Sequence, residues 1–429
     1  MSEWITCTLG EVAEFIQTGP FGAQLHQSDY SDKGIPVVMP QDMDGGRIVT
    51  TNIARVEAHH VERLKRHKLQ EGDIVYSRRG DVGRSGYVSE NQSGWLCGTG
   101  CLLVRLDKTK VYPRFIAYYL RQESQVAWVE NNAVGITMLN LNTGILAAAP
   151  LRIPSSIEEQ KRIADELTAI DAKIEHNNEL IKMLEEQAQL VYDYWFMQFD
   201  FPDENGKPYR SSGGKMVWND KLKREIPEGW KIAGIDRFLT LTRGVSYKPT
   251  DASDIPTPMH TCILRANNID FGTIRWDGLV YVKTERVNQK TQRLKENDIV
   301  IVMSSGSKEH VGKTATAWGD LDCSYGAFCA KITPHEQCTS YVRTSLRSST
   351  FRAFLKKQLL ATNINNISLS VLANYIVPEP TYNVLERFQQ ITGEIYTRCN
   401  TLHAEIYELT KQRDFLLPLL MSGQVKVAE

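Results

Sequence analysis

The sequence lacks the features that would indicate a membrane protein, a disulfide-stabilised protein or a fibre. No stretch of its 429 residues approaches eighteen consecutive apolar residues, and the opening MSEWITCTLG has no basic start followed by an apolar run. The eight cysteines are irregularly spaced and form no disulfide framework, so we expect them to stay reduced. These absences predict a cytoplasmic globular protein without membrane association, long enough for two or more domains.

An excess of either charge is also missing. The chain has 50 Lys and Arg against 51 Asp and Glu, a formal net charge of -1. Overall charge therefore argues neither for nor against nucleic acid as a ligand. A DNA-binding face would have to come from local segregation of charge.

The sequence contains no recognisable catalytic constellation. A methyltransferase should show an Asn-Pro-Pro-aromatic or Asp-Pro-Pro-aromatic loop and a glycine-rich cofactor strand, and neither occurs. A metal-dependent nuclease should show Pro-Asp before a D/E-x-K strand, but the Pro-Asp at 202–203 has no such partner. The segment CGTGC at 97–101 has no second Cys or His pair nearby, so we interpret it as two cysteines on a buried strand. We expect no catalytic site and no metal site.

One segment, NDIVIVMSSGSKEHVGKT at 297–314, resembles a phosphate-binding loop. Its loop from Gly306 to Gly312 is one residue too long for that motif, and the following ATAWGDLDC has no helical pattern. The amide groups and helix dipole that a phosphate needs would therefore be missing. We interpret this segment, and YSRRGDVGRSGYV at 76–88, as hairpin loops that carry basic residues.

The dominant feature that is present is an internal repeat. The phrase LQEGDIV at 69–75 returns as LKENDIV at 294–300. Further matches at nearly the same offset pair Trp4 with Trp230, Gly19 with Gly244, Cys97 with Cys323, Gly100 with Gly326, Asn140 with Asn366, Leu146 with Leu372 and Pro154 with Pro380. Matches spread over a whole half-chain indicate one unit used twice, with strongly diverged polar residues.

Each repeat changes character near its end. Short β-rich runs and turns with one helical stretch predict an α+β domain, and a long helix without turn residues follows. We therefore predict a pseudo-twofold protein of the α+β class, in which two repeated α+β domains are separated by two long helices that form an antiparallel coiled coil. The predicted boundaries are 1–153 for domain 1, 154–197 for spacer helix 1, 198–229 for a connector, 230–379 for domain 2 and 380–421 for spacer helix 2.

Apolar residues on both long helices alternate in spacing between four and three, the seam of a coiled coil. The predicted helix-pairing residues are Ile163, Leu167, Ile170, Ile174, Ile181 and Leu184 in the first helix, and Ile395, Leu402, Ile406 and Leu409 in the second. The second seam is less apolar and contains Arg413. The first seam predicts a rod of roughly 50 Å, which equals the rise of about 14 base pairs.

Several segments occur in an order that closely resembles the specificity subunit of type I restriction-modification enzymes. They are the paired domain openings W…LG and IPEGW, RIPSSIEEQKRI entering the first long helix, the connector, and the closing LLPLLMSGQVKV. The second junction, VPEPTYNVLERF, lacks the usual Glu-Gln start. The resemblance covers essentially the whole chain.

This resemblance implies a non-catalytic subunit in which each domain reads one half of a split asymmetric site in double-stranded DNA. It also implies that the paired helices fix the gap and dock two methylation subunits, in a complex with restriction subunits. S-adenosylmethionine, ATP and magnesium would then be bound by those partners, and no cofactor by this chain. The alternative of a different class is a two-headed structural adaptor without sequence-specific DNA binding.

Basic residues are concentrated at the same place in both repeats. Residues 63–84 include seven Lys or Arg and three Asp or Glu, and residues 283–313 include seven Lys or Arg and four Asp or Glu. Because Arg can bind guanine bidentately and Asn or Gln can bind adenine, base contacts are expected from loop Arg, Asn and Gln. The candidates are Gln17, Thr18, Arg78, Arg79, Arg84, Thr137 and Asn140 in the first repeat, and Arg243, Lys308, Lys313, Asn363 and Asn365 in the second. A solvated charged face is the competing interpretation for any single Lys.

Overall fold

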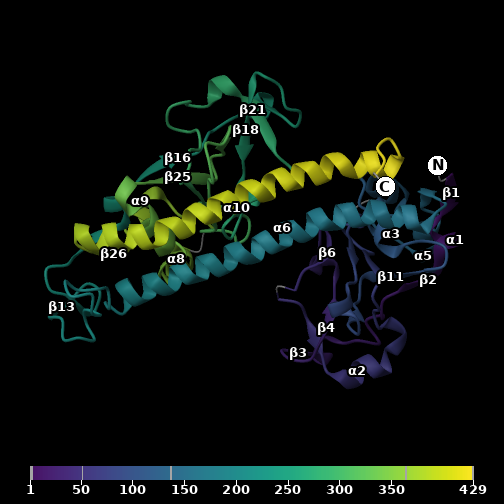
Figure 1. Ribbon diagram of the computed structural model, residues 1–429, viewed down its shortest axis with the longest axis horizontal. Helices are drawn as coiled ribbons and strands as arrows, with labels where there is room; N and C mark the ends of the chain where they lie inside the picture. Colours follow the sequence, from purple (N-terminus) through teal and green to yellow (C-terminus); the bar gives the residue numbers. More distant parts are fainter. Residues whose placement is uncertain (1–2, 51, 136–137, 363–364, 428–429) are drawn as a thin grey trace. The chain divides into compact units, whose positions relative to one another are not determined.

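The computed structural model describes residues 3–50, 52–135, 138–362 and 365–427, and the chain divides into two compact units (Figure 1). Unit 1 combines Met1–Lys173 with Leu409–Glu429, and unit 2 is Ile174–Glu408. Each unit therefore contains an α+β domain and a part of both long helices. The fold class predicted from the sequence is confirmed.

Unit 1 builds its domain on short strands. The strands are β1 Trp4–Thr8, β2 Ala13–Thr18, β3 Tyr30–Ser31, β4 Ile35–Val38, β5 Met43–Asp44, β6 Gly46–Ile48, β7 Arg55–Val56, β8 Ile74–Ser77, β9 Ser85–Tyr87, β10 Leu96–Cys97, β11 Cys101–Leu106 and β12 Pro150–Pro154. They form sheets with the orders β2-β11-β8-β9-β6-β5 and β10-β4-β7-β3, while β1 pairs with β12. The short helices are α1 Leu9–Val12, α2 Ala58–Arg63, α3 Pro113–Leu120, α4 Glu123–Asn132 and α5 Thr143–Ala147.

Unit 2 repeats this plan after a connector hairpin. Its strands are β13 Met216–Asn219, β14 Arg224–Pro227, β15 Lys231–Gly234, β16 Leu239–Arg243, β17 Ala252–Ser253, β18 His260–Leu264, β19 Ile269–Asp270, β20 Thr273–Ile274, β21 Val280–Lys283, β22 Ile299–Val302, β23 Thr314–Thr316, β24 Cys323–Tyr325, β25 Cys329–Pro334 and β26 Ile376–Glu379. The short helices are α7 Thr339–Ser345, α8 Ser349–Thr362 and α9 Leu369–Ala373.

The strand orders show that the two domains have the same topology. The order β16-β25-β22-β23 in unit 2 matches β2-β11-β8-β9 in unit 1, and β24-β18-β21-β17 matches β10-β4-β7-β3. Both four-stranded sheets contain one parallel pair, β4 with β10 and β18 with β24. The pairing of β15 with β26 likewise repeats that of β1 with β12. The repeat predicted from the sequence is therefore a repeat of the fold.

The structure corrects the predicted alignment of the cysteines and of one glycine. A Cβ atom on Gly19 would lie 2.0 Å from the carbonyl oxygen of Gly98, and one on Gly244 would lie 2.0 Å from that of Gly326. Gly98, not Gly100, therefore corresponds to Gly326. The same register aligns Cys101 with Cys329, because each accepts a backbone hydrogen bond from the first glycine of its pair.

The alignment of Cys97 with Cys323 is wrong by two residues for a structural reason. The loop between β22 and β23 covers 303–313, eleven residues, whereas the loop between β8 and β9 covers 78–84, seven residues. These four extra residues raise the offset between equivalent residues from 225 at Ser77 and Val302 to 229 at Arg84 and Lys313. One residue fewer in the next segment of unit 2 leaves it at 228 for Cys101 and Cys329, two more than the predicted 226. Cys97 and Cys101 are both buried, but they lie on the separate strands β10 and β11 rather than on one strand.

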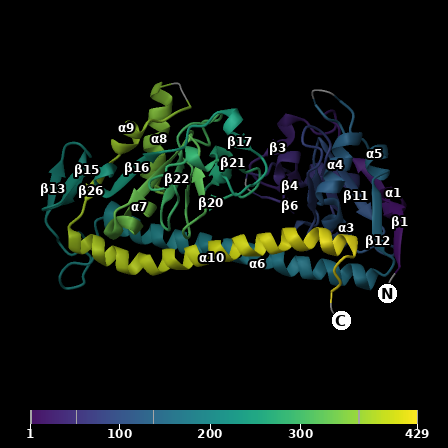
Figure 2. The same ribbon diagram turned by 90° about the horizontal axis from the view of Figure 1, so that it is seen from above.

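The two long helices pair antiparallel within each unit. They are α6, Ile157–Tyr192, which continues as a π-helical turn to Met197, and α10, Tyr382–Ser422 (Figure 2). In unit 1, Ile163 and Leu167 of α6 share a core with Leu417 and Leu420 of α10. In unit 2, Ile181 of α6 packs on Leu402. Residue numbers rise along α6 while they fall along α10, so the helices run in opposite directions.

The predicted helix-pairing residues differ in how deeply they are buried. The buried ones are Ile163, Leu167, Ile174, Ile181 and Leu402, and the half-buried ones are Ile170, Leu184, Ile395, Ile406 and Leu409. Polar residues occupy other positions of the same seam. Asn177 is fully buried and donates to a Glu405 carboxylate oxygen at 3.0 Å.

An ionic network occupies the helix pair of unit 1. The Asp171 carboxylate accepts from the Tyr118 hydroxyl at 2.8 Å and pairs with Arg413 of α10 at 3.1 Å and with Arg121 at 3.2 Å. Burial opposes ionisation of Asp171, but the two arginines and the tyrosine outweigh it, so the pKa of this carboxyl lies below its ordinary value. Arg413, which interrupts the predicted apolar seam, therefore has a buried anionic partner.

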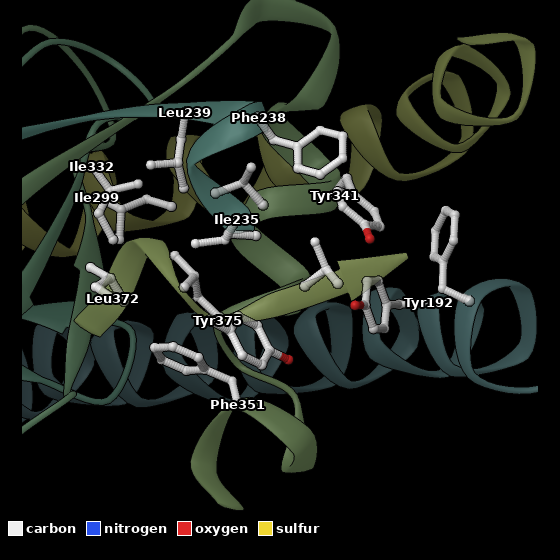
Figure 3. Packing of buried hydrophobic residues seen from close by; sticks show 14 of the residues in the cluster. Tyr192, Ile235, Phe238, Leu239, Ile299, Ile332, Tyr341, Phe351, Leu372 and Tyr375 are labelled. Atoms are coloured by element: carbon white, nitrogen blue, oxygen red, sulfur yellow. The ribbon is translucent and has the colours of Figure 1, made fainter. Parts of the chain in front are cut away.

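The largest core of unit 2 joins α6 to the domain. Tyr192 of α6 points towards Tyr341, Ile235 and Tyr375 of the domain in Figure 3. Phe196 contacts Tyr341 edge to face, with ring centroids 4.9 Å apart. Aromatic residues at the end of α6 therefore hold this helix against α7 and α10 of unit 2.

Candidate nucleic-acid interface

One end of the large sheet in unit 1 gathers loops that are far apart in the sequence. β2 ends at Thr18, which pairs with Leu102 at the start of β11, and Cys101 pairs with Ser77 at the end of β8. The loops at Gly98–Gly100 and Arg78–Arg84 therefore lie side by side. We call this loop cluster, with Thr18 and Asn140, sheet end 1.

A later segment fixes the backbone of the arginine loop. Arg79 and Asn140 form an antiparallel bridge, and the Leu141 amide donates to the Arg78 carbonyl at 2.8 Å. The Gly80 amide donates to the Leu139 carbonyl at 3.1 Å. Two predicted candidates, Arg79 and Asn140, are thus brought together although sixty residues separate them.

The side chains of sheet end 1 differ in their engagement. Arg79 is exposed, whereas Arg84 pairs with Asp81 at 2.5 Å within its own loop. Arg78 is half-buried, and its buried Nε has no hydrogen-bond partner among the described residues. The buried Oδ1 of Asn140 also has none there. Both of these atoms are buried, so a polar ligand would meet the exposed Arg79 before either of them.

Gln17 and Thr18 lie at the edge of this cluster. The Gln17 side chain donates to the Arg66 carbonyl at 2.5 Å and accepts from the Arg66 guanidinium at 3.3 Å. Arg66 is exposed and was not among the predicted candidates. Its membership in the basic run from 63 to 68 was the available signal, but the contact with β2 depends on the fold.

The corresponding end of the sheet in unit 2, sheet end 2, has the same backbone plan. Ser304 and Asn366 form the bridge that corresponds to that of Arg79 and Asn140, and the Ile367 amide donates to the Met303 carbonyl at 2.9 Å. The loop from 303 to 313 is a hairpin between β22 and β23, as predicted for the segment that resembled a phosphate-binding loop. Asn365 supports it by donating to the Gly306 carbonyl at 3.0 Å.

The predicted cations of sheet end 2 have different surroundings. Arg243, at the end of β16, and Lys308, in the hairpin loop, are exposed. Lys313 is mostly buried, where its Nζ pairs with Asp270 at 2.8 Å and lies 4.8 Å from the centre of the Phe271 ring. This partner lowers the ability of Lys313 to bind a phosphate. The remaining candidates, Thr137 and Asn363, lie outside the described residues.

Equivalent backbone positions of the two sheet ends carry different side chains. The Ser77 amide, at the end of β8, donates to the Arg84 carbonyl, and the Val302 amide, at the end of β22, donates to the Lys313 carbonyl. Arg84 and Lys313 therefore occupy equivalent positions. By the same registers, Arg79 corresponds to Ser304 and Gly100 to Phe328. Arginine and asparagine can read base edges, whereas serine and phenylalanine offer different contacts. The same scaffold therefore presents two different chemical surfaces.

Neither sheet end resembles a metal or nucleophile site. Within the described ranges, no group of three or more His, Cys, Asp or Glu side chains could hold a metal ion. Burial raises the pKa of the Cys329 thiol to about 12, which keeps it in the unreactive protonated form. No helix in the described part of the chain is long and apolar enough to cross a membrane.

Comparisons with known proteins agree with this architecture. Residues 1–186 match the family model described as type I restriction modification DNA specificity domain. The StySPI specificity subunit of Salmonella potsdam is 34% identical over 209 residues, an alignment that covers 48% of this chain and 45% of that relative. The chain thus matches less than half of that relative's length.

Two further comparisons extend along the chain. The MjaIX specificity subunit of Methanocaldococcus jannaschii is 21% identical over 417 residues, covering 94% of this chain and 89% of that relative. The crystal structure of the type I restriction-modification S subunit from M. genitalium superposes with a TM-score of 0.54 at 16% identity, covering 98% of this chain and 96% of that one. This last likeness concerns the fold alone. Residues 1–186 thus match the type I restriction modification DNA specificity domain, and the chain is similar along most of its length to type I restriction enzyme specificity subunits.

Proposed function

We propose that the chain recognises a bipartite, asymmetric DNA sequence, with sheet end 1 reading one half and sheet end 2 the other. One observation carries this proposal: the two sheet ends share their backbone hydrogen bonds but exchange Arg79 for Ser304 and Gly100 for Phe328. A scaffold kept in duplicate with different side chains suits two readers of different base sequences. A purely structural adaptor would have no need of this divergence.

Phosphate contacts would position the duplex before its bases are read. Arg79 is exposed at sheet end 1, and Arg66, which contacts Gln17 beside it, is also exposed. Arg243 and Lys308 are exposed at sheet end 2. Net charge near zero leaves these local clusters to attract DNA, so binding should weaken as salt rises.

The proposal includes two methylation subunits as partners, with restriction subunits in the full complex. Leu190 on α6 and Phe415 on α10 occupy equivalent positions, since Tyr192 and Leu417, two residues further along, are both buried. Leu190 is 70% exposed and Phe415 is 69% exposed. Apolar side chains left exposed at the same position of both repeats fit two copies of one partner.

The chain itself is proposed to be non-catalytic and to bind no cofactor. Methylation and cleavage would be performed by partner subunits that bind S-adenosylmethionine, ATP and magnesium. The sequence supports this division because it contains none of the methyltransferase or nuclease motifs that such chemistry requires.

A gel-shift experiment separates DNA reading from a structural adaptor role. The chain is tested with and without co-expressed methylation subunits, on the duplex recovered by sequencing methylated positions, against competitor DNA. Sequence recognition predicts that specific binding survives an excess of unrelated duplex. If unrelated competitor DNA abolishes binding to the site, both with and without the methylation subunits, the proposed function is refuted.

A further inference from the structure

Two phenylalanines at sheet end 2 are largely exposed, and the role assigned to them below rests on the proposed function. Phe328 lies in the loop before β25, and Phe271 lies in the turn between β19 and β20. Each is 68% exposed. A large apolar side chain so exposed is costly in water, although a single one is common on protein surfaces.

Both phenylalanines belong to one row along the end of the sheet. Arg243 ends β16, Phe328 precedes β25, Ser304 follows β22, and Lys313 precedes β23. The bridge between Gly272 and Ala315 places the turn of Phe271 next to β23. Neighbouring strands are about 4.8 Å apart, so Phe328 and Phe271 are separated by three strand spacings, roughly 14 Å. Figure 2 follows this order through the labels β16, β22 and β20.

The equivalent positions in unit 1 are glycines. Gly100 corresponds to Phe328, because the carbonyl of each accepts a backbone hydrogen bond at the start of its hairpin loop, from Arg78 or from Met303. Gly45 corresponds to Phe271, since Met43 pairs with Ile48 as Ile269 pairs with Ile274. Sheet end 1 therefore lets its backbone approach a ligand, while sheet end 2 presents two aromatic rings.

The surroundings of the two rings favour a DNA ligand. Two exposed cations, Arg243 and Lys308, lie on the same sheet end, while the Lys313 ammonium over the Phe271 ring is already paired with Asp270. An aromatic ring between cations suits a surface with phosphates outside and flat bases inside. An apolar protein partner would gain nothing from these cations.

We propose that Phe328 and Phe271 are base-contacting residues of sheet end 2, which bind the bases of its half-site through their apolar rings. Sheet end 1 would read its half-site through arginine and asparagine hydrogen bonds instead. The two rings should touch positions about four base pairs apart, the rise that corresponds to their roughly 14 Å separation.

The test uses the full chain with its methylation subunits, the duplex that carries the recognised site, and an unrelated duplex. Phe328→Ala and Phe271→Ala should each weaken binding to the site by roughly 5- to 100-fold, with no change on the unrelated duplex or in the salt dependence. Base substitutions in the half-site should lose their effect at one position in the first variant and about four base pairs away in the second. The control, Tyr382→Ala, removes an aromatic residue of unit 2 that is 57% exposed at the start of α10, and should bind like the wild type.

Each contrary outcome has its own meaning. If the wild type does not distinguish the two duplexes, the proposed function fails and this inference fails with it. If the wild type does distinguish them while both alanine variants bind the site equally well, the inference alone is overturned. Equal weakening of binding to both duplexes would also overturn it. Loss of the methylation subunits with intact DNA binding would overturn it in favour of a contact with a protein partner. Thermal unfolding of the variants checks that these exposed substitutions leave the fold intact.

Discussion

Acid should destabilise unit 2 through one buried histidine on α10. His403 is 6% exposed, and its Nε2 has no hydrogen-bond partner in the part of the chain that the structure describes. Burial lowers the pKa of His403 to about 3, and the nearby Arg343 and Arg347 act in the same direction. The folded protein therefore holds this imidazole neutral, whereas the unfolded chain protonates it near pH 6.5.

The size of the effect follows from these two pKa values. Because the folded pKa lies below the unfolded one, the stabilising contribution is complete above about pH 6.5 and is lost as the pH falls towards 3. The free energy of unfolding should change by about 1.4 kcal/mol per pH unit within this window, which amounts to about 2 kcal/mol between pH 7.5 and 5.0. His403→Leu removes the titrating group and should remove that part of the pH dependence.

The measurement is urea unfolding followed by tryptophan fluorescence at both pH values. The quantity of interest is the loss of stability from pH 7.5 to 5.0 in the wild type minus the same loss in His403→Leu. Cys399→Ala serves as the control, since it opens a cavity at a buried position one turn away and should destabilise the protein equally at both pH values. A loss that is the same in the wild type and in His403→Leu would refute the assignment of a neutral buried histidine.

Other parts of the molecule offer sharper or simpler tests. Asp171→Ala removes the anion shared by the half-buried Arg121 and Arg413, of which Arg413 keeps only the exposed Asp414, and should cost about 3 kcal/mol in urea unfolding, so a cost below 1 kcal/mol would contradict the network. Replacing residues 1–153 with the corresponding domain of a relative should change one half of the methylated site, as read by sequencing, and a change in both halves would disprove modular reading. Arg79→Ala should relax the choice of one base with a loss of about 1–3 kcal/mol, whereas Lys308→Ala should weaken all duplexes alike and lower the salt slope by about one; salt titrations on matched and mismatched duplexes distinguish the two.

The sequence predicted those features that are expressed in regular spacing. The α+β class, the repeat and the antiparallel helix pair follow from apolar periodicity and from phrases that recur at one offset. The sequence did not predict the lengths of equivalent loops correctly. Four extra residues in the loop from 303 to 313 shifted the alignment, so Cys97 was matched with Cys323 while the backbone matches Cys101 with Cys329.

Buried polar groups could not be predicted from spacing. In the sequence, Arg413 is a charged residue at an otherwise apolar seam position. Only the fold shows that it pairs with Asp171, which also pairs with Arg121. The prediction of base-contacting residues considered hydrogen-bonding side chains, and therefore passed over the exposed rings of Phe271 and Phe328. Spacing also does not show which cation finds an anion in the fold. The sequence therefore could not distinguish Arg79, which is exposed, from Lys313, which is paired with Asp270.

The composition of unit 1 has a consequence for how the protein is made. Its core contains Leu417, Leu420 and Met421 from the last helix, although the rest of the unit ends at Lys173. A ribosome must add residues 174–408 before that helix segment exists, which takes roughly 10–50 s at about 5–20 residues per second. During this interval Ile163 and Leu167 of the nascent chain lack the partners that cover them in the finished protein. The first domain to be synthesised is therefore the last to be completed, and the face of its helix that α10 covers stays open until residues 409–421 have been made.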